Sequence, residues 1–158
     1  MTIIDSAIRA AAAVLSSAAS ICQAWAISVT DLRSDHQIRP LGTSPEPLLT
    51  WRITAEERNQ RQSAWQVLVA SERAMLEKNA ADLWDSGKTA ATREPGLLYA
   101  GKPLEAGRIC HWKVRCWDAA GEASSWSEPS VFEVAPHSPA GWHGARWMCF
   151  AVTTALTA

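Results

Sequence analysis

Acidic side chains are the first residues to consider for chemistry, because a pair of carboxyl groups can act as acid and base in hydrolysis. In inverting glycosidases the two groups lie about 6.5 to 9.5 Å apart, one protonating the leaving oxygen and the other activating water. The candidates in this sequence are Asp82, Asp85, Asp118, Glu122 and Glu128. Each falls in a turn or at the end of an apolar stretch, where solvated carboxylates are common. We therefore interpret them as turn residues and assign no catalytic residue.

Histidine and cysteine side chains near the C-terminus could in principle bind a metal. His137, His143 and Cys149 are separated by five residues each, a spacing that matches no compact zinc motif. His111 stands alone in an alternating stretch and is read as a surface residue. The sequence contains neither a Gly-rich phosphate loop nor a Gly-x-Ser-x-Gly nucleophile elbow. We expect no metal and no cofactor.

Tryptophan is unusually frequent, with nine residues against one Tyr and two Phe. Large indoles are used either in a small β-sheet core or on a face that stacks ligands. Trp117 and Trp126 are the candidates for stacking a sugar ring, provided that both are exposed. The alternative is that Trp126, within Ser124-Ser125-Trp126-Ser127, lies along a sheet edge and covers cationic side chains such as Arg115.

The charge of the chain is nearly balanced. Fifteen basic and sixteen acidic residues give a formal net charge of −1, which is too small to produce the field that nucleic acid or an anionic membrane requires. We expect neither as a partner.

The first 26 residues have the pattern of a signal peptide. Arg9 precedes the alanine-rich apolar run from Ala10 to Ile21, and Ala24-Trp25-Ala26 places small residues where a signal peptidase reads them. The run is shorter than the roughly 20 apolar residues of a membrane-spanning helix. A frayed amphipathic N-terminal helix is the alternative. We expect a secreted or periplasmic protein.

Cysteines do not suggest a disulfide framework. Without the leader, which removes Cys22, an odd number remains: Cys110, Cys116 and Cys149. Cys110 and Cys116 are six residues apart on one expected strand, about 20 Å at strand rise, so they cannot bridge each other. We interpret both as core residues.

Short stretches with period-two alternation, separated by turn residues, predict an all-β sandwich of about seven antiparallel strands. A short helical turn is expected between Ser71 and Leu83, and no stretch suits a parallel crossover helix. The expected strands are Ile27–Arg33, Leu48–Ile53, Ser63–Ala70, Asp82–Gly87, Gly96–Ala100, Ile109–Asp118 and Glu128–Val134.

The strand from Ile109 to Asp118 is the clearest. Its alternation predicts that Cys110, Trp112, Val114 and Cys116 face the core, while Trp117 faces water with the other odd-numbered residues. The sandwich should span residues 27–136, with residues 137–158 a linker or the truncated start of a further domain. The expected core consists of Trp51, Trp65, Val67, Cys110, Trp112, Val114 and Phe132.

Five motifs resemble, in order and spacing, the N-terminal domain of bacterial α-L-rhamnosidases of the glycoside hydrolase family 78 type. The resemblance covers roughly Val29 to Trp147. The motifs are Leu49-Thr50-Trp51-Arg52, Arg61-Gln62-Ser63-Ala64-Trp65-Gln66-Val67-Leu68-Val69-Ala70-Ser71, Leu83-Trp84-Asp85-Ser86-Gly87-Lys88, Trp112-Lys113-Val114-Arg115-Cys116-Trp117-Asp118 and Trp126-Ser127-Glu128-Pro129.

The resemblance implies a fibronectin type III or immunoglobulin-like fold, in agreement with the strand map. It also implies a larger enzyme, in which further sandwiches and an (α/α)6 barrel remove terminal rhamnose by inversion; none of that barrel's acidic residues lies in the matched part. Residues 149–158 do not resemble the family, which suggests a truncated or frame-shifted product. Cys110 stands where related domains commonly place an aromatic residue, often a corner tyrosine, and Cys116 where Val is usual.

We therefore expect a non-catalytic accessory domain whose partners are the neighbouring domains of a secreted rhamnosidase. The alternative is an autonomous carbohydrate-binding module that uses Trp117 and Trp126.

Overall fold

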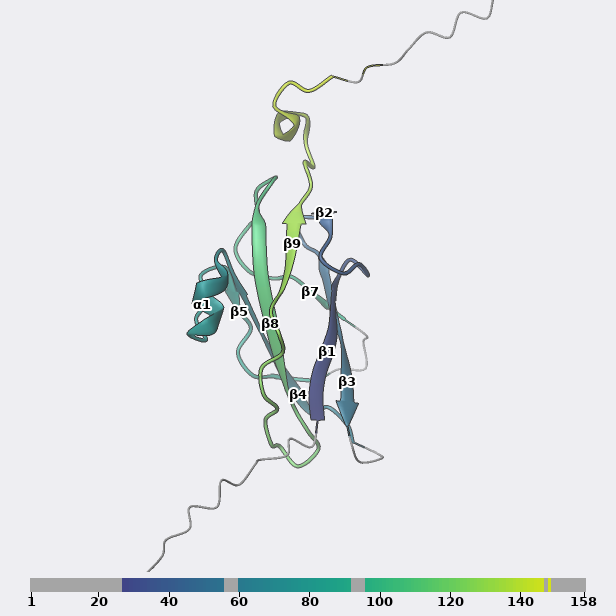
Figure 1. The fold of residues 1–158 in the computed structure, drawn as a ribbon, viewed down its shortest axis with the longest axis vertical. Helices are drawn as coiled ribbons and strands as arrows, with labels where there is room; N and C mark the ends of the chain where they lie inside the picture. Colours follow the sequence, from purple (N-terminus) through teal and green to yellow (C-terminus); the bar gives the residue numbers. More distant parts are fainter. Residues whose placement is uncertain (1–26, 56–59, 92–95, 147, 149–158) are drawn as a thin grey trace, which may run out of the picture.

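The computed structural model describes residues 27–55, 60–91, 96–146 and 148. They form two facing sheets (Figure 1). The smaller sheet has the order β1-β3-β7, and the larger has the order β2-β9-β8-β4-β5, with β6 also paired to β4. The strands are β1 (Ile27–Ser34), β2 (Leu41–Thr43), β3 (Leu48–Ala55), β4 (Ala64–Ala70), β5 (Trp84–Asp85), β6 (Thr89–Ala90), β7 (Leu97–Leu98), β8 (Ile109–Trp117) and β9 (Ser130–Val134).

The antiparallel pair β4–β8 forms the centre of the larger sheet. Its register places Val67 opposite Val114 and Val69 opposite Trp112, so that β-branched and aromatic side chains meet directly across the strands. Alternate residues of both strands face the smaller sheet and fill the space between the layers. The alternation seen in the sequence therefore sets both the register and the side on which the core forms.

The expected strands are present, with two additions. The short strands β2 and β6 were not predicted, and β2 pairs with β9 in the parallel direction, whereas the pairings among the expected strands are antiparallel, as predicted. Gly42, with φ of 152°, lies between the two paired residues of β2, where the register shifts. A three-residue strand of this kind shows no alternation that sequence analysis could detect.

Most of the expected core lies between the sheets. Trp65, Val67, Cys110, Trp112, Val114 and Phe132 belong to one buried cluster. Trp51 is an exception: it is only partly buried and packs against that cluster from the edge. Trp51 lies on β3, beyond Leu48 and Leu49, which are the residues of β3 that pair with β7.

A second, smaller apolar cluster lies on the outer face of the larger sheet. The short helix α1 (Arg73–Glu77) supplies Leu76, which clusters with Leu68 and Ala70 of β4. The part of β8 beside this cluster is covered on both faces, since Lys113 and Trp117 are buried. The prediction of one wet face along β8 was therefore wrong for these residues.

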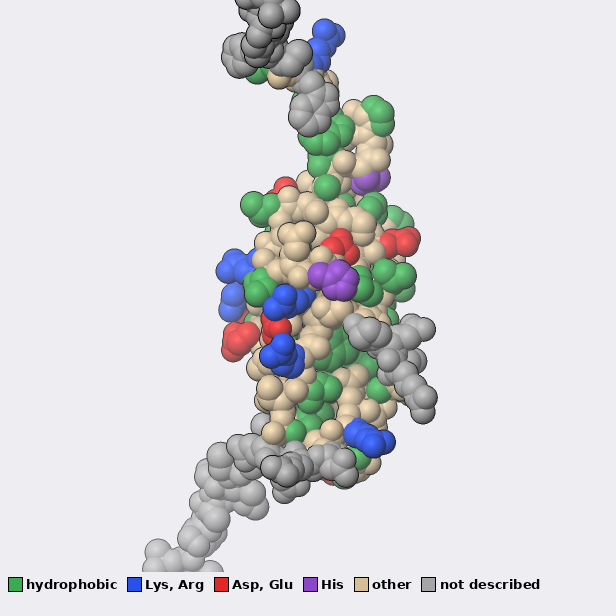
Figure 2. Space-filling model, turned by 90° about the vertical axis from the view of Figure 1, so that its right-hand side faces the viewer, with side chains coloured by type: hydrophobic (Ala, Val, Ile, Leu, Met, Phe, Trp, Pro, Cys, Tyr) green, Lys and Arg blue, Asp and Glu red, His purple; other side chains and the backbone are tan. Residues whose placement is uncertain are grey.

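After β9 the chain leaves the sandwich through residues 135–146, which include the 3-10 helix η1 (Pro139–Trp142) (Figure 1). The proposed signal peptide, Cys22, Trp147 and Cys149 lie outside the described residues. Within the described ranges, no helix has the length and apolar character needed to cross a membrane. Basic and acidic side chains are interspersed over the face shown in Figure 2.

Candidate functional site

Two indoles and three cations form a continuous stack on the outer face of the larger sheet. The Arg115 guanidinium lies 4.9 Å from the centre of the Trp117 ring and 4.6 Å from that of Trp126. The stack ends on one side with Lys88, 4.7 Å from the Trp117 ring, and on the other with Lys113, 4.7 Å from the Trp126 ring. Such contacts contribute about 0.5 to 2 kcal/mol each, more when they are desolvated.

Strand periodicity positions three of the five side chains of this stack. Lys113, Arg115 and Trp117 are two residues apart along β8, so their side chains project from the same face. Across the β4–β8 ladder, Arg115 lies opposite Gln66, whose Oε1 accepts hydrogen bonds from Arg115 Nε at 3.1 Å and Nη2 at 2.8 Å. The neighbouring strand thus holds the guanidinium between the two rings.

Two serines flanking Trp126 place its ring over β8. Ser124 and Ser127 each bond a residue of β8 twice: the backbone N–H groups donate to Cys116 O and Val114 O at 2.8 Å, and the hydroxyls accept from the N–H groups of the same two residues at 3.1 Å. The two serines therefore provide hydrogen-bond partners for the backbone groups of Val114 and Cys116, at the edge of β8 that no described strand pairs with. Trp126, between them, is directed onto Lys113 and Arg115.

Lys113, the cation at one end of the stack, also holds α1 against the sheet. Lys113 is 5% exposed, and its Nζ donates to Leu76 O and, at 2.6 Å, to Asn79 Oδ1. None of the ion pairs found among the described residues includes Lys113. Burial, together with the nearby Arg115 charge, lowers the pKa of this ammonium group. Two hydrogen bonds and an indole replace the carboxylate that a buried lysine commonly requires.

The carboxylates of Asp118 and Asp85, which were predicted to be turn residues, do stabilise turns. Asp118 Oδ1 accepts from the N–H groups of Ala120 and Glu122, both at 2.9 Å. Asp85 Oδ1 accepts from the N–H of Gly87 at 2.8 Å, where φ is +61°.

Asp82 binds Ser71 through both the backbone N–H, at 2.8 Å, and the hydroxyl, at 2.7 Å. Burial alone would raise the pKa of Asp82, but the hydrogen bonds from Ser71 lower it below its ordinary value. Asp82 therefore joins the end of β4 to the segment after α1.

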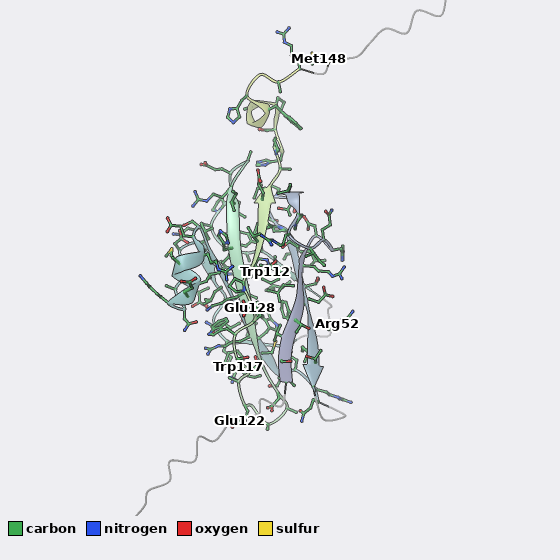
Figure 3. The ribbon with its side chains drawn as sticks, viewed as in Figure 1. Arg52, Trp112, Trp117, Glu122, Glu128 and Met148 are labelled. Atoms are coloured by element: carbon green, nitrogen blue, oxygen red, sulfur yellow. The ribbon has the colours of Figure 1, made fainter. Side chains whose placement is uncertain are left out.

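These carboxylates do not converge on one site. Glu122 lies in the loop after β8, well apart from Glu128 (Figure 3), and both are exposed. Within the described part of the chain, no three His, Cys, Asp or Glu side chains gather as metal ligands would. His137 and His143 are exposed, and half-buried His111 has its pKa lowered by burial, Arg73 and Arg39.

The stack corrects the expectation that Trp117 is exposed. Its side chain does leave the strand on the outer face, but it is only 8% exposed, because Lys88 and Arg115 lie against it. Trp126 is half-buried over Arg115 and Lys113. Each of the two indoles proposed to stack a sugar is thus already in contact with two cations.

A groove of about 910 Å³ lies at the edge of the sandwich, beside Trp51. Trp51 and Trp65 meet edge to face in it, with ring centres 6.1 Å apart. Gln62 Oε1 accepts from Trp51 Nε1 at 3.1 Å and from the Cys116 thiol at 3.2 Å. Burial raises the pKa of that thiol to about 12. Sequence reasoning missed Gln62, because a polar residue before a strand carries no periodic signal.

Sequence analysis also missed Tyr99, which lies just after β7. Its ring contacts Trp84 edge to face at 5.4 Å, and its hydroxyl donates to Lys102 O at 2.7 Å. This is a bond of the kind expected from a corner tyrosine, made here by a residue away from β8. At the position where related domains place the aromatic, Cys110 is fully buried in the core.

Comparisons with known proteins agree with this fold. Residues 29–138 match a family model described as the Rha78A-like, N-terminal immunoglobulin domain. An α-L-rhamnosidase of Streptomyces avermitilis is 40% identical over 124 residues, which is 78% of this chain and 12% of that protein. An α-L-rhamnosidase of Formosa agariphila is 37% identical over 105 residues, or 66% of this chain and 11% of that protein.

Solved structures give the same result. The α-L-rhamnosidase from Dictyoglumus thermophilum superposes with a TM-score of 0.69 at 34% identity, covering 73% of this chain and 13% of that one. The Streptomyces avermitilis enzyme complexed with L-rhamnose gives 0.69 at 40% identity, covering 74% and 11%. The chain thus spans about an eighth of these relatives. It belongs to the family of Rha78A-like N-terminal immunoglobulin domains.

Proposed function

We propose that this chain is a non-catalytic accessory domain of a secreted α-L-rhamnosidase-type glycoside hydrolase, and that its role is to pack against and stabilise neighbouring domains. The observation that carries the proposal is the match itself: residues 29–138 correspond to the N-terminal immunoglobulin domain of proteins about eight times longer than the match. The carboxylates of the described residues support it, since the bonded ones stabilise turns and segment ends instead of converging.

A domain exchange tests the packing role. The Streptomyces avermitilis enzyme would be prepared whole, without its matched domain, and with residues 27–138 of this chain in its place. We expect the deletion to lower the melting temperature and the exchanged domain to restore part of it, because the interdomain contacts return. A chimera no more stable than the deletion would contradict the proposal.

A turnover assay tests the absence of catalysis. The purified 158-residue chain, incubated with an aryl α-L-rhamnoside, should release no more product than buffer does. Release of several moles of product per mole of protein, retained through repeated chromatography, would show that the chain is an enzyme.

Secretion rests on the sequence of residues 1–26. N-terminal sequencing of the exported protein should find Ile27 first, because cleavage would follow Ala26. A protein that keeps residues 1–26 and stays in the cytoplasm would refute this part of the proposal.

Carbohydrate binding is the second candidate function. The groove beside Trp51 is a better candidate site for a sugar than the stack of indoles and cations. Its volume is within the range of small-ligand sites, and it combines aromatic walls with polar groups such as Thr50 and Gln62. Rhamnose should then quench tryptophan fluorescence in the native chain and in Trp142→Phe, but not in Trp51→Phe. Unchanged fluorescence at saturating rhamnose would exclude this candidate.

A further inference from the structure

The segment after β9 is folded and has hydrogen bonds of its own. Pro136 and Pro139 restrict φ at two of its positions, whereas flexible linkers are rich in Gly and Ser. Ser138 caps the start of η1, since its backbone O accepts from the Gly141 N–H at 3.0 Å and its hydroxyl oxygen accepts from the same group at 3.4 Å. We call residues 135–146 the exit segment.

The exit segment rests on the sandwich at Gly141. A Cβ atom at this position would lie 3.2 Å from Ala106 Cβ, in the loop before β8, and 3.3 Å from Pro136 Cβ. Glycine permits this close approach because it has no side chain. The contact seats η1 at the end of the sandwich, beyond the arrowhead of β9 (Figure 1). The next residue, Trp142, is therefore held in a defined position.

A turn folds the end of the exit segment back on itself. His143 and Gly144 have φ of 46° and 81°, and the Ala145 N–H donates to Trp142 O at 2.9 Å. Ala145 and Arg146 thereby return toward the start of the segment.

The folded segment forms a groove of about 600 Å³. The rings of Pro136, Pro139 and Trp142 provide its apolar walls. Among the described residues, the ionisable side chains that line it are His137 and Arg146, which are both basic types. The groove therefore suits an apolar surface that carries a carboxylate.

Trp142 keeps a large part of its indole in water, with 51% of the residue exposed. Burial of an indole is among the largest contributions that one side chain can make to an interface, and Trp and Arg are enriched where interfaces bind most tightly. The groove contains one residue of each type, Trp142 and Arg146. These features are typical of a docking surface.

A domain joined to the exit segment is the partner best placed to cover it. Arg146 is four residues after Trp142, a separation of at most about 14 Å in an extended chain. A domain that begins soon after Arg146 is thus tethered beside the indole, at an effective concentration in the millimolar range. The matched domain is N-terminal in its family, so the rest of such a chain follows it.

We propose that the exit segment is the docking site for the domain that follows this one in a rhamnosidase-type chain, with Trp142 as the anchor. An apolar side chain of that domain occupies the groove between the indole and the two prolines, and a carboxylate of that domain faces Arg146. This inference rests on the accessory function proposed above and adds the surface through which the domains pack.

The domain exchange tests this surface when it includes the exit segment, as residues 27–146 placed in the Streptomyces avermitilis enzyme. Trp142→Ala in this chimera should remove most of the melting temperature that the exchanged domain restores. The same change in the 158-residue chain should shift its melting temperature little, because the indole is exposed there. A chimera stabilised equally with and without the indole would overturn the proposal and leave the accessory function standing. A chimera no more stable than the deletion would contradict both.

Two further variants of the chimera identify the contact. Leu98→Ala is the matched control, since Leu98 is 59% exposed but lies on β7 of the smaller sheet, and it should keep the full stabilisation. Arg146→Glu should lose part of it, because it sets a carboxylate against the carboxylate of the following domain. Equal losses in Leu98→Ala and Trp142→Ala would overturn the proposal.

Hydroxyl-radical footprinting measures the coverage of the indole without any substitution. Trp142 should be oxidised several-fold more slowly in the chimera than in the 158-residue chain, because the docked domain excludes water from its ring. Leu98 should be oxidised at the same rate in both proteins. Equal oxidation of Trp142 in the two proteins would show that nothing docks on the indole and would overturn the proposal.

Discussion

The hydroxyl of Ser127 accepts a hydrogen bond of 3.1 Å from the backbone N–H of Val114, at a point where no strand pairs with that edge of β8. The side chain of one residue thereby takes the place of a strand carbonyl. Together with Ser124, it allows an irregular segment to satisfy the edge of the central strand and to direct Trp126 onto it.

Removal of this hydroxyl should destabilise the domain. In Ser127→Ala the Val114 N–H stays buried without a partner, which costs about 1 to 3 kcal/mol. Urea unfolding followed by circular dichroism measures the loss. Ser125→Ala is the matched control, since Ser125 is exposed and its side chain should contribute little. Equal midpoints for the two variants would show that the hydroxyl does not support β8.

Trp117→Ala should be far more harmful than replacement of an exposed indole. Trp117 is 8% exposed and holds Lys88 and Arg115, so its truncation should lower the free energy of unfolding by about 3 to 5 kcal/mol. Trp142→Ala, at a position 51% exposed, should cost less than about 1 kcal/mol. Thermal unfolding of both variants makes the comparison. A native-like melting temperature for Trp117→Ala would mean that this indole is free at the surface.

Stability should fall in alkaline solution. Burial raises the pKa of the Cys116 thiol from 9.0 to about 12 and that of Cys110 from 9.0 to about 11. Burial likewise raises the pKa of Tyr99 from 10.0 to about 12. A raised pKa in the folded state means that the neutral group is favoured there, so its contribution is complete below pH 9 and is lost as the pH rises toward 12. Urea midpoints measured from pH 7 to 11 should be constant and then decline.

Replacement of the thiols should reduce that decline. Cys110→Val and Cys116→Val remove the ionisable group but keep an apolar side chain of similar size. Each variant should show a shallower fall above pH 9 than the native chain, with Tyr99 still contributing. A slope that is identical in all three proteins would mean that the thiols ionise as readily in the folded as in the unfolded chain.

Acid should weaken the link between Asp82 and Ser71. The hydrogen bonds from Ser71 lower the pKa of Asp82 against the opposing effect of burial. A lowered pKa contributes stability above the ordinary value of 3.8 that is lost as the pH falls through the folded value. Asp82→Asn should therefore be less stable than the native chain at pH 7, and the difference should shrink toward pH 3. A difference that does not change with pH would assign the link to the shape of the side chain alone.

Period-two alternation predicted the long strands because their residues have one consistent environment on each face. It correctly placed Trp65, Val67, Trp112 and Val114 between the sheets. The alternation pattern was wrong for Lys113 and Trp117, because it predicted that these side chains are exposed to water on the outer face. Lys113 is covered by α1 and the segment around Trp126, and Trp117 is covered by Lys88 and Arg115. No local pattern in β8 reveals a covering segment that is distant in the sequence.

Other features depend on single contacts and have no periodic signal. The parallel pairing of Leu41 with Glu133 joins residues 92 positions apart through a three-residue strand. Gln62 and Tyr99 act through one side-chain group each, directed by the packing around them. The Ser-Ser-Trp-Ser sequence is the exception, since it predicts an indole that lies along the sheet edge over Arg115, and Trp126 has that position.

The stack draws its five side chains from three separate segments: the one after β5, the strand β8, and the segment around Trp126. If the last of these segments lifted away, two cations would lose their ring together and the edge of β8 would lose four hydrogen bonds. Partial opening is thereby linked to the unravelling of the central strand. A protease should therefore find few intermediate forms to attack.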